Sequence, residues 1–255
     1  MNVVETHGLM KTFGSNTAVD HFEMHVNEGD FYGFVGRNGA GKTTVMRVLA
    51  GLAAPSGGDV SVFGMAPQEA GASRRIGVLI ESPGLYGTMS AYDNMMLKAL
   101  NLGLVNPKER VLDLLAFTGL GNVGSKKTKH FSMGMKQRLG LALALLGDPD
   151  LLLLDEPLNG LDPEGAREIR QLIMQLNADR GITVVVSSNV LEQLGKMATR
   201  YGIICEGRMV REMTAADVEQ ECSDFLQLNA ANPTLALAAL QERFPNLRFQ
   251  SMPDA

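Results

Sequence analysis

A glycine-rich stretch, GRNGAGKTT (36–44), combines small residues, a lysine and hydroxyl side chains at a spacing that can bind phosphate groups. It fits the pattern G-x-x-x-x-G-K followed by Ser or Thr, and it lies between an apolar run (31–35) and a helical pattern (43–52). Glycines let backbone N–H groups turn inward around an anion, and the following helix N-terminus adds partial positive charge. Lys42 would then contact the β- and γ-phosphates of ATP, and the Thr43 hydroxyl would bind Mg²⁺. The residues of this loop predicted to bind the nucleotide are Gly36, Arg37, Asn38, Gly39, Ala40, Gly41, Lys42, Thr43 and Thr44.

A second stretch, LLLLDEPLNGLDP (151–163), supplies the acidic groups that nucleotide chemistry needs. Four leucines predict a buried strand that ends at Asp155, where a carboxylate can hold Mg²⁺ through water. Glu156 follows at once and could polarise an attacking water molecule as a general base, with Lys42 as a second catalytic residue. The alternatives are ordinary ones: a glycine-rich turn that only begins a helix, and a strand that ends in an acidic turn. The presence of both stretches in one chain favours a nucleotide-hydrolysing site.

A third stretch, VVVSSNVLEQL (184–194), places small polar residues between an apolar strand pattern and the start of a helical pattern. Such corners often face a ligand, because ligands bind at the carboxyl ends of parallel strands. Asn189 at this corner either contacts the substrate or caps the helix, with Glu192 three positions later as in a capping box. The residues alone leave both roles open.

The elements that position these stretches alternate between strands and helices. Asp162 and Pro163 predict a helix start, the apolar spacing of Ile169, Leu172, Ile173 and Leu176 continues the helix, and Gly181 ends it. This strand–helix–strand unit predicts a mostly parallel sheet. The predicted strands are 31–35, 59–63, 76–80, 151–155 and 182–186.

Two other regions have a different pattern. Residues 82–147 contain helical patterns at 91–104, 107–120 and 134–147 without a convincing strand, which predicts an all-helical subdomain inserted into the sheet domain. Residues 223–255 read as strand (223–230), helix (233–244) and strand (246–252). Three elements bury little core, so this appendage is expected to be incomplete or exchanged with a partner.

Composition narrows the class of protein. The chain has 255 residues, 45% hydrophobic and 20% charged, and a net charge of −5 without a long basic run, so no nucleic-acid partner is expected. Its two cysteines lack C-x-x-C spacing and its four histidines are scattered, which predicts a reducing compartment and no metal cluster. No segment is long and apolar enough to span a membrane, so work at a membrane would require another chain.

The stretch FSMGMKQRLGLA (131–142), between the phosphate loop and the acidic strand, resembles the signature of ATP-binding cassette (ABC) proteins, usually L-S-G-G-Q. Ser132 and Gly134 match that form, whereas Phe131, Met133 and Met135 depart from it. The order of the motifs also resembles the family over residues 1 to about 220. The resemblance implies an α/β P-loop NTPase fold of the ABC ATPase type, with a mixed sheet core and an inserted helical subdomain (about 82–147). It assigns residues 1–222 to the nucleotide-binding domain, and the residue patterns of 223–255 predict a short βαβ appendage after it.

Further site residues follow from the resemblance alone. Phe13 matches the aromatic residue that stacks on adenine, although a core phenylalanine is the alternative. Glu81 stands where most members have the glutamine of the Q-loop. A glutamate at this position resembles the branch that exports lantibiotics and bacitracin-like peptides. Glu81 could ligate Mg²⁺ or be a surface residue. Asp162 matches the D-loop. Asn189 occupies the position of the family's switch histidine, which implies a third catalytic residue that faces the γ-phosphate. Ser132 would begin a helix whose N-terminus binds the γ-phosphate across a dimer interface.

The function implied by the resemblance is that of the ATP-binding and hydrolysing subunit of a bacterial ABC transporter. It would use ATP and Mg²⁺ to power export of a peptide antibiotic, a lantibiotic or a related substrate. A separate permease and a second copy of the chain in an ATP sandwich are the implied partners. The chain would be cytoplasmic, on the inner face of the cell membrane. The alternatives are a soluble ABC ATPase not coupled to transport and a non-hydrolysing regulatory subunit, the latter suggested by the altered signature and Asn189.

Overall fold

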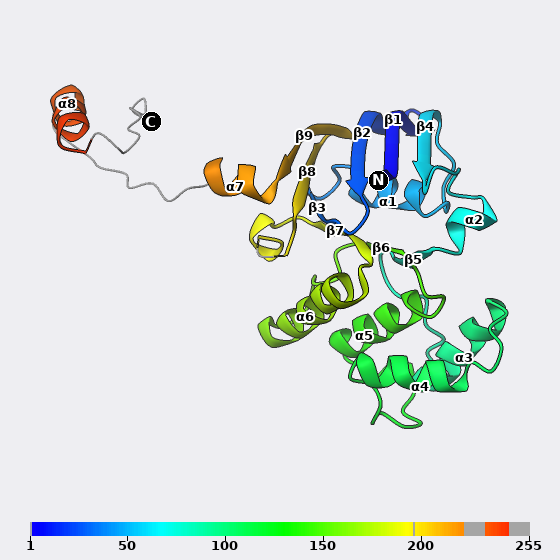
Figure 1. Cartoon of the computed structure of the whole chain (residues 1–255). Helices are drawn as coiled ribbons and strands as arrows, with labels where there is room; N and C mark the ends of the chain where they lie inside the picture. Colours follow the sequence, from blue (N-terminus) through cyan, green and yellow to red (C-terminus); the bar gives the residue numbers. More distant parts are fainter. Residues whose placement is uncertain (1, 196, 222–232, 245–255) are drawn as a thin grey trace. The chain divides into compact units, whose positions relative to one another are not determined.

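The computed structural model describes residues 2–195, 197–221 and 233–244 (Figure 1). The chain forms two compact units, Met1–Val218 and Glu219–Ala255. The second unit contains the helix α8 (Pro233–Arg243), at the position where the sequence predicts one. The two strands predicted at 223–230 and 246–252 lie outside the described residues. All predicted site residues belong to the first unit.

The first unit is built around a six-stranded sheet in the order β5-β6-β7-β3-β8-β9. Neighbouring strands run parallel, except that β9 is antiparallel to β8. The prediction of a mostly parallel central sheet is therefore confirmed. The strands are β3 (Phe31–Val35), β5 (Ile76–Leu79), β6 (Leu151–Leu154), β7 (Thr183–Ser188), β8 (Arg200–Cys205) and β9 (Arg208–Thr214).

A second sheet has three antiparallel strands in the order β2-β1-β4. They are β1 (Asn2–Phe13), β2 (Asn16–Asn27) and β4 (Gly57–Val62), so the strand predicted at 59–63 belongs to this sheet. The sequence patterns did not predict β1 and β2. Their pairing contains several register shifts, one of them between Thr6 and Leu9, and these shifts interrupt the alternation by which a half-buried strand is recognised.

The central strands β3 and β6, and most of β7, are apolar because both of their faces are covered. Successive side chains of a strand point to opposite faces. Leu151, Leu153 and Val185 accordingly pack in one hydrophobic core with the three-stranded sheet and α1 (Lys42–Leu49). Leu152 and Leu154 pack in the other core with the helices α5 (Met133–Ala144) and α6 (Pro163–Arg180). This packing fixes the carboxyl ends of β6 and β7 beside the loop that follows β3.

Residues 82–147, all of which are described, contain helices and no named strand. Figure 1 shows α3, α4 and α5 grouped together, apart from the three-stranded sheet. A capping box between Ser90 and Asp93 starts α3, and α6 ends at Gly181 in the left-handed conformation (φ 66°), as its sequence predicts. No helix among the described residues is long and apolar enough to cross a membrane. The helices and 3₁₀ turns of residues 82–147 are α3 (Ala91–Asn101), α4 (Lys108–Phe117), η1 (Thr128–His130) and α5.

Candidate functional site

The glycine-rich loop joins β3 to α1, and two of its glycines, Gly36 and Gly41, have no room for a side chain. A Cβ atom on Gly41 would lie 2.6 Å from the carbonyl oxygen of Ala18, and Gly41 is in the left-handed region at φ 109°. A Cβ atom on Gly36 would lie 2.5 Å from the Cγ2 atom of Ile204. The loop is thus closely packed against β2 and β8, with its backbone free to face an anion.

Lys42 is buried at the start of α1, and its ammonium group is held by the loop itself. Its Nζ atom donates hydrogen bonds to the carbonyl oxygens of Gly36 (2.7 Å) and Arg37 (3.2 Å). It also lies 3.2 Å from the Oε1 atom of Glu156, so two of the residues predicted to be catalytic form an ion pair. A buried lysine needs such partners, because an uncompensated charge in this position is strongly unfavourable.

Thr43 and Asp155, both predicted to bind metal, are in direct contact. The hydroxyl of Thr43 donates to the Oδ2 atom of Asp155 at 2.6 Å, across 112 positions of the chain. Asp155 follows β6 and is only 5% exposed. Its other oxygen, Oδ1, accepts a hydrogen bond of 2.5 Å from the hydroxyl of Ser187 at the end of β7. Two hydroxyl groups therefore fix both oxygens of a buried carboxylate.

Glu156 has an unusual backbone conformation, with φ at 46°. A non-glycine residue in the left-handed region carries strain of about 1–3 kcal/mol, and such strain often occurs at functional sites. The backbone N–H of Glu156 donates to the Ser187 hydroxyl at 2.9 Å, and its Oε2 atom accepts from Asn159 at 3.0 Å. The side chain is turned toward Lys42 by these contacts and is 24% exposed.

The glycine-rich loop and the acidic residues Asp155 and Glu156, which follow β6, line one cavity of about 610 Å³. This volume lies within the range of about 300–1,000 Å³ typical of small-molecule sites. Met133 and Gln137 of α5 also line it. The predicted site residues that line the cavity are Asn38, Gly39, Gly41, Lys42, Thr43, Thr44, Glu81, Asp155 and Glu156.

Glu81 lines the same cavity but has a different partner from the predicted one. Its Oε1 atom lies 2.7 Å from a guanidinium nitrogen of Arg47 on α1, and both side chains are about half exposed. Its backbone is in the left-handed region at φ 62°. The carboxylate of Glu81 thus lies at the same cavity as Thr43 and Asp155, but it is paired with Arg47 rather than with either of them.

Asn189 lies at the end of β7, and the alternative that it caps a helix is wrong. Instead of a longer helix the chain forms only a 3₁₀ turn, η2 (Leu191–Gln193), whose cap residue is Val190 and has no side-chain cap bond. The hydroxyl of Ser188 accepts the Val190 N–H at 3.0 Å. The exposed Asn189 instead donates from Nδ2 to the Oδ1 atom of Asn38, at 3.3 Å. It therefore faces the phosphate loop.

The other predicted residues do not line the cavity. Phe13 is 51% exposed at the β1–β2 turn, so the alternative of a core phenylalanine is wrong. Ser132 caps α5 by accepting the N–H of Met135 at 3.2 Å, so a helix does begin there. Gly134 lies in the first turn of α5. A Cβ atom added to it would lie 3.8 Å from its nearest neighbour, the Cδ2 atom of Leu161. Asp162 is the cap residue of α6, but its side chain accepts no cap hydrogen bond.

Ser187 and Asn159 are the site residues that sequence reasoning missed. The role of Ser187 follows from strand pairing in the structure: β6 and β7 pair in parallel with Leu154 opposite Val186, so the residues that follow, Asp155 and Ser187, are neighbours. Asn159 lies in the loop after Glu156, where no residue pattern marked it.

Comparisons with known proteins agree with this architecture. The family model described as ABC transporter matches residues 19–159. The bacitracin transport ATP-binding protein BcrA of Bacillus licheniformis is 38% identical over 244 residues, which cover 95% of this chain and 79% of that protein. The lantibiotic transport ATP-binding protein SrtF of Streptococcus pyogenes is 39% identical over 210 residues, covering 82% and 90% of the two chains.

The fold is also similar to that of solved structures. A nucleotide-free ATP-binding cassette from an ABC transporter superposes with a TM-score of 0.79 at 22% identity, covering 88% of this chain and 96% of that one. The ATP-binding cassette MJ0796, described as a dimer in a post-hydrolysis state bound to ADP and Pi, has a TM-score of 0.75 at 24% identity, with 83% and 98% coverage.

Proposed function

The chain belongs to the ABC transporter family, as an ATP-binding and ATP-hydrolysing cassette, and from this premise we propose that it powers export of a peptide antibiotic, a lantibiotic or a related substrate. The observation that carries the proposal is the similarity, over most of the chain, to ATP-binding proteins of bacitracin and lantibiotic transport. The contact between Thr43 and Asp155 supports it further, because it joins the two halves of a nucleotide site.

In the proposed reaction Lys42 binds the terminal phosphates of ATP, and Glu156 orients and deprotonates the attacking water. Lys42 and Glu156 contact each other at 3.2 Å. ATP must therefore draw the ammonium group away from Glu156, which leaves that carboxylate free to act as the base. Binding of the substrate and preparation of the base are thus a single event in this scheme.

The residues around Thr43 and Asp155 fit Mg²⁺, which prefers oxygen ligands and keeps several waters. Thr43 supplies a hydroxyl and Asp155 a carboxylate, and the buried position of Asp155 keeps these donors in place. Bound here, Mg²⁺ would neutralise charge on the phosphate oxygens. Glu81 is a further candidate ligand if its side chain leaves Arg47.

We further propose that two copies of the chain enclose ATP between them. The Ser132 cap and the first turn of α5, including Gly134, would face the γ-phosphate bound by the other copy, since a helix N-terminus favours an anion. Ser132 and Asp162 are exposed in the single chain, which leaves them available to a second copy. Phe13, exposed at the β1–β2 turn, would stack on the adenine.

A separate membrane permease would convert dimer closure into transport. A second cavity, of about 460 Å³, lies beside α3 and is lined by apolar residues such as Leu97 and Leu102. Ile80 and Ser82 line it too, while Glu81 between them lines the nucleotide cavity. This segment therefore borders both cavities, and we propose that it transmits movement from ATP to a permease seated in the second. The chain would be cytoplasmic, on the inner face of the cell membrane.

The test combines purification and a survival assay in the native host. The tagged chain is purified from detergent-solubilised membranes, and an integral membrane protein should co-purify with it. Leu102→Asp should reduce the amount of this membrane protein without changing the affinity of the chain for ATP. Cells that carry Glu156→Gln should become more sensitive to a peptide antibiotic of the bacitracin or lantibiotic class.

A chain that hydrolyses ATP but recovers no membrane protein would instead be a soluble ABC ATPase. A chain that recovers a membrane protein but releases no phosphate would be the non-hydrolysing regulatory subunit that Asn189 and the altered signature suggest.

A further inference from the structure

Two histidines that are distant in sequence lie together on the three-stranded sheet. Pairing of β1 with β2 brings His7, Glu23 and His25 to the outer face of that sheet, while Thr6 and Met24 beside them are buried. One nitrogen or carboxylate oxygen from each of the three lies within 4.8 Å of the others. This grouping was not foreseen from the sequence, because the spacing of the histidines along the chain does not reveal the pairing of strands.

The carboxylate of Glu23 is held in place by the backbone of β1. Its Oε1 atom accepts the N–H of Gly8 at 2.6 Å, at the register shift between Thr6 and Leu9. Its Oε2 atom lies 3.4 Å from the Nδ1 atom of His7. Two ligands at about 2.0–2.1 Å from a tetrahedral zinc ion lie roughly 3.3 Å apart, so this separation already suits a shared metal.

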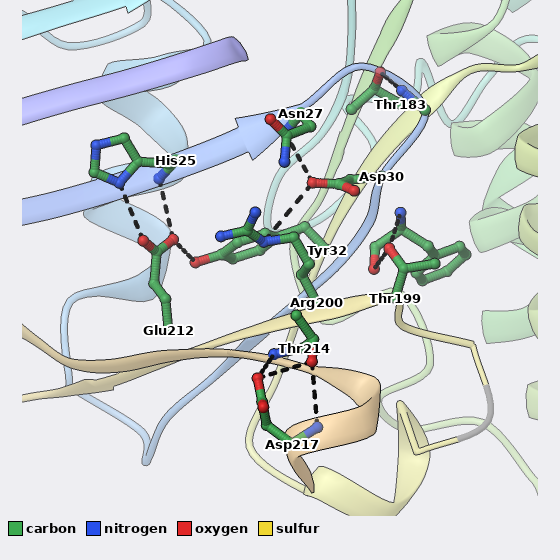
Figure 2. Close-up of polar contacts among 12 residues, drawn as sticks. His25, Asn27, Asp30, Tyr32, Thr183, Thr199, Arg200, Glu212, Thr214 and Asp217 are labelled. Atoms are coloured by element: carbon green, nitrogen blue, oxygen red, sulfur yellow. Dashed lines mark hydrogen bonds and ion pairs between the residues drawn. The ribbon is translucent and has the colours of Figure 1, made fainter. Parts of the chain in front are cut away.

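His25 is oriented by a carboxylate from the other sheet, as Figure 2 shows. Glu212 of β9 places its Oε2 atom 3.1 Å from the Nδ1 atom of His25, and its Oε1 atom accepts the His25 backbone N–H at 3.0 Å. When Nδ1 carries the proton that Glu212 accepts, Nε2 keeps its lone pair. Metal-binding histidines almost always have such a carboxylate, carbonyl or water partner on their other nitrogen.

Glu212 is itself fixed from the protein interior. The hydroxyl of the buried Tyr32 donates to its Oε1 atom at 2.6 Å. Burial, and then the charge of Glu212, raise the pKa of Tyr32 well above its usual range, so the phenol stays a donor at neutral pH. Tyr32 thus fixes Glu212, and Glu212 positions the imidazole of His25. A surface histidine does not require such support.

We propose that His7, Glu23 and His25 form a binding site for a divalent transition-metal ion, with Zn²⁺ as the ion of choice and Glu212 as a positioning residue. Two imidazoles and one carboxylate suit zinc, whereas Mg²⁺ and Ca²⁺ prefer oxygen ligands. The side chains of His7, Glu23 and His25 are 62%, 50% and 38% exposed, so an ion can approach from solvent and keep a water ligand. The ion would link β1 to β2.

The experiment titrates the full-length, nucleotide-free chain with Zn²⁺ in a calorimeter, without Mg²⁺. His7→Gln should weaken zinc binding at least tenfold, and Glu212→Gln, which removes the support of His25, by about 10–100-fold. His21→Gln is the matched control: His21 is an exposed histidine of β2, the strand that carries Glu23 and His25, but its ring contacts Asp20 at 2.6 Å and is not part of the cluster. This control should bind zinc as the parent does.

Thermal melting separates loss of the site from loss of the fold. Without zinc, His7→Gln should melt at the parental temperature, since His7 is an exposed side chain. Zinc should raise the melting temperature of the parent and of His21→Gln, because a ligand stabilises the state that binds it, and should raise that of His7→Gln much less. Equal zinc affinity, or an equal shift in melting temperature, in the parent and His7→Gln would overturn the proposal.

Discussion

Ser187→Ala should destabilise the protein and slow ATP hydrolysis, because this hydroxyl connects the two acidic residues of the site. It donates to the Oδ1 atom of Asp155 at 2.5 Å and accepts the N–H of Glu156 at 2.9 Å. A hydrogen bond to a charged group contributes about 1.5–3 kcal/mol, and one between neutral groups about 0.5–1.5 kcal/mol. Asp155 is 5% exposed, so water cannot easily replace the lost donor.

The change should therefore lower the free energy of unfolding by roughly 2–4 kcal/mol. In a domain of this size a loss of about 2 kcal/mol lowers the melting temperature by roughly 4–8 °C. The backbone N–H of Glu156, a residue in the left-handed conformation, also loses its hydrogen-bond acceptor. Since small displacements of a catalytic group are costly, we expect kcat to fall about tenfold or more.

The neighbouring Ser188→Ala is the matched control. The hydroxyl of Ser188 bonds uncharged groups, the N–H of Val190 and the side chain of Gln193, and does not touch Asp155. It should lower the melting temperature less and leave kcat close to that of the parent. The assays are thermal denaturation and steady-state phosphate release. If Ser187→Ala matches the parent in both, or if the two variants behave alike, the assigned role of Ser187 is wrong.

Substitutions at three further residues test other parts of the site. Lys42→Ala should abolish tight ATP binding by calorimetry, because the loop loses its buried cation; parental affinity would reject the phosphate-binding assignment. Asn189→His should raise kcat with little change in ATP affinity, whereas Asn189→Ala should lower it, since a donor to transition-state charge is typically worth about 10²–10³ in rate. Equal rates in all three proteins would mean that this corner does not act on the nucleotide. Glu81→Gln should leave the melting temperature nearly unchanged, because an exposed ion pair contributes about 0–1 kcal/mol, but should raise the Mg²⁺ concentration needed for hydrolysis; an unchanged requirement would exclude Glu81 as a ligand.

The parts of the fold predicted from the sequence are those in which local pattern and burial agree. The strands β3, β6 and β7 were predicted because both of their faces are covered by apolar cores. The helix α6 was predicted because Pro163 marks its start and Gly181 its end. The phosphate loop was predicted because its chemistry depends on consecutive residues.

The features that were missed depend on contacts between distant parts of the chain. Ser187 acts through Asp155 of the neighbouring strand, a pairing that its own segment does not reveal. The cluster of His7, Glu23 and His25 forms through the pairing of β1 with β2. Asn189 was considered as a helix cap because VLEQL has helical spacing, but the Ser188 hydroxyl accepts the Val190 N–H and only the short turn η2 forms.

The central claim, that Glu156 acts as the base in an ATP-hydrolysing site, is tested most directly by phosphate release from the parent and from Glu156→Gln. The amide keeps the shape of the side chain but cannot accept the proton. It also removes the negative charge that pairs with Lys42 at 3.2 Å. We predict that the variant binds ATP at least as tightly as the parent, releases no phosphate above background, and elutes as an ATP-bound dimer in size-exclusion chromatography. Hydrolysis by Glu156→Gln at the parental rate would contradict the account.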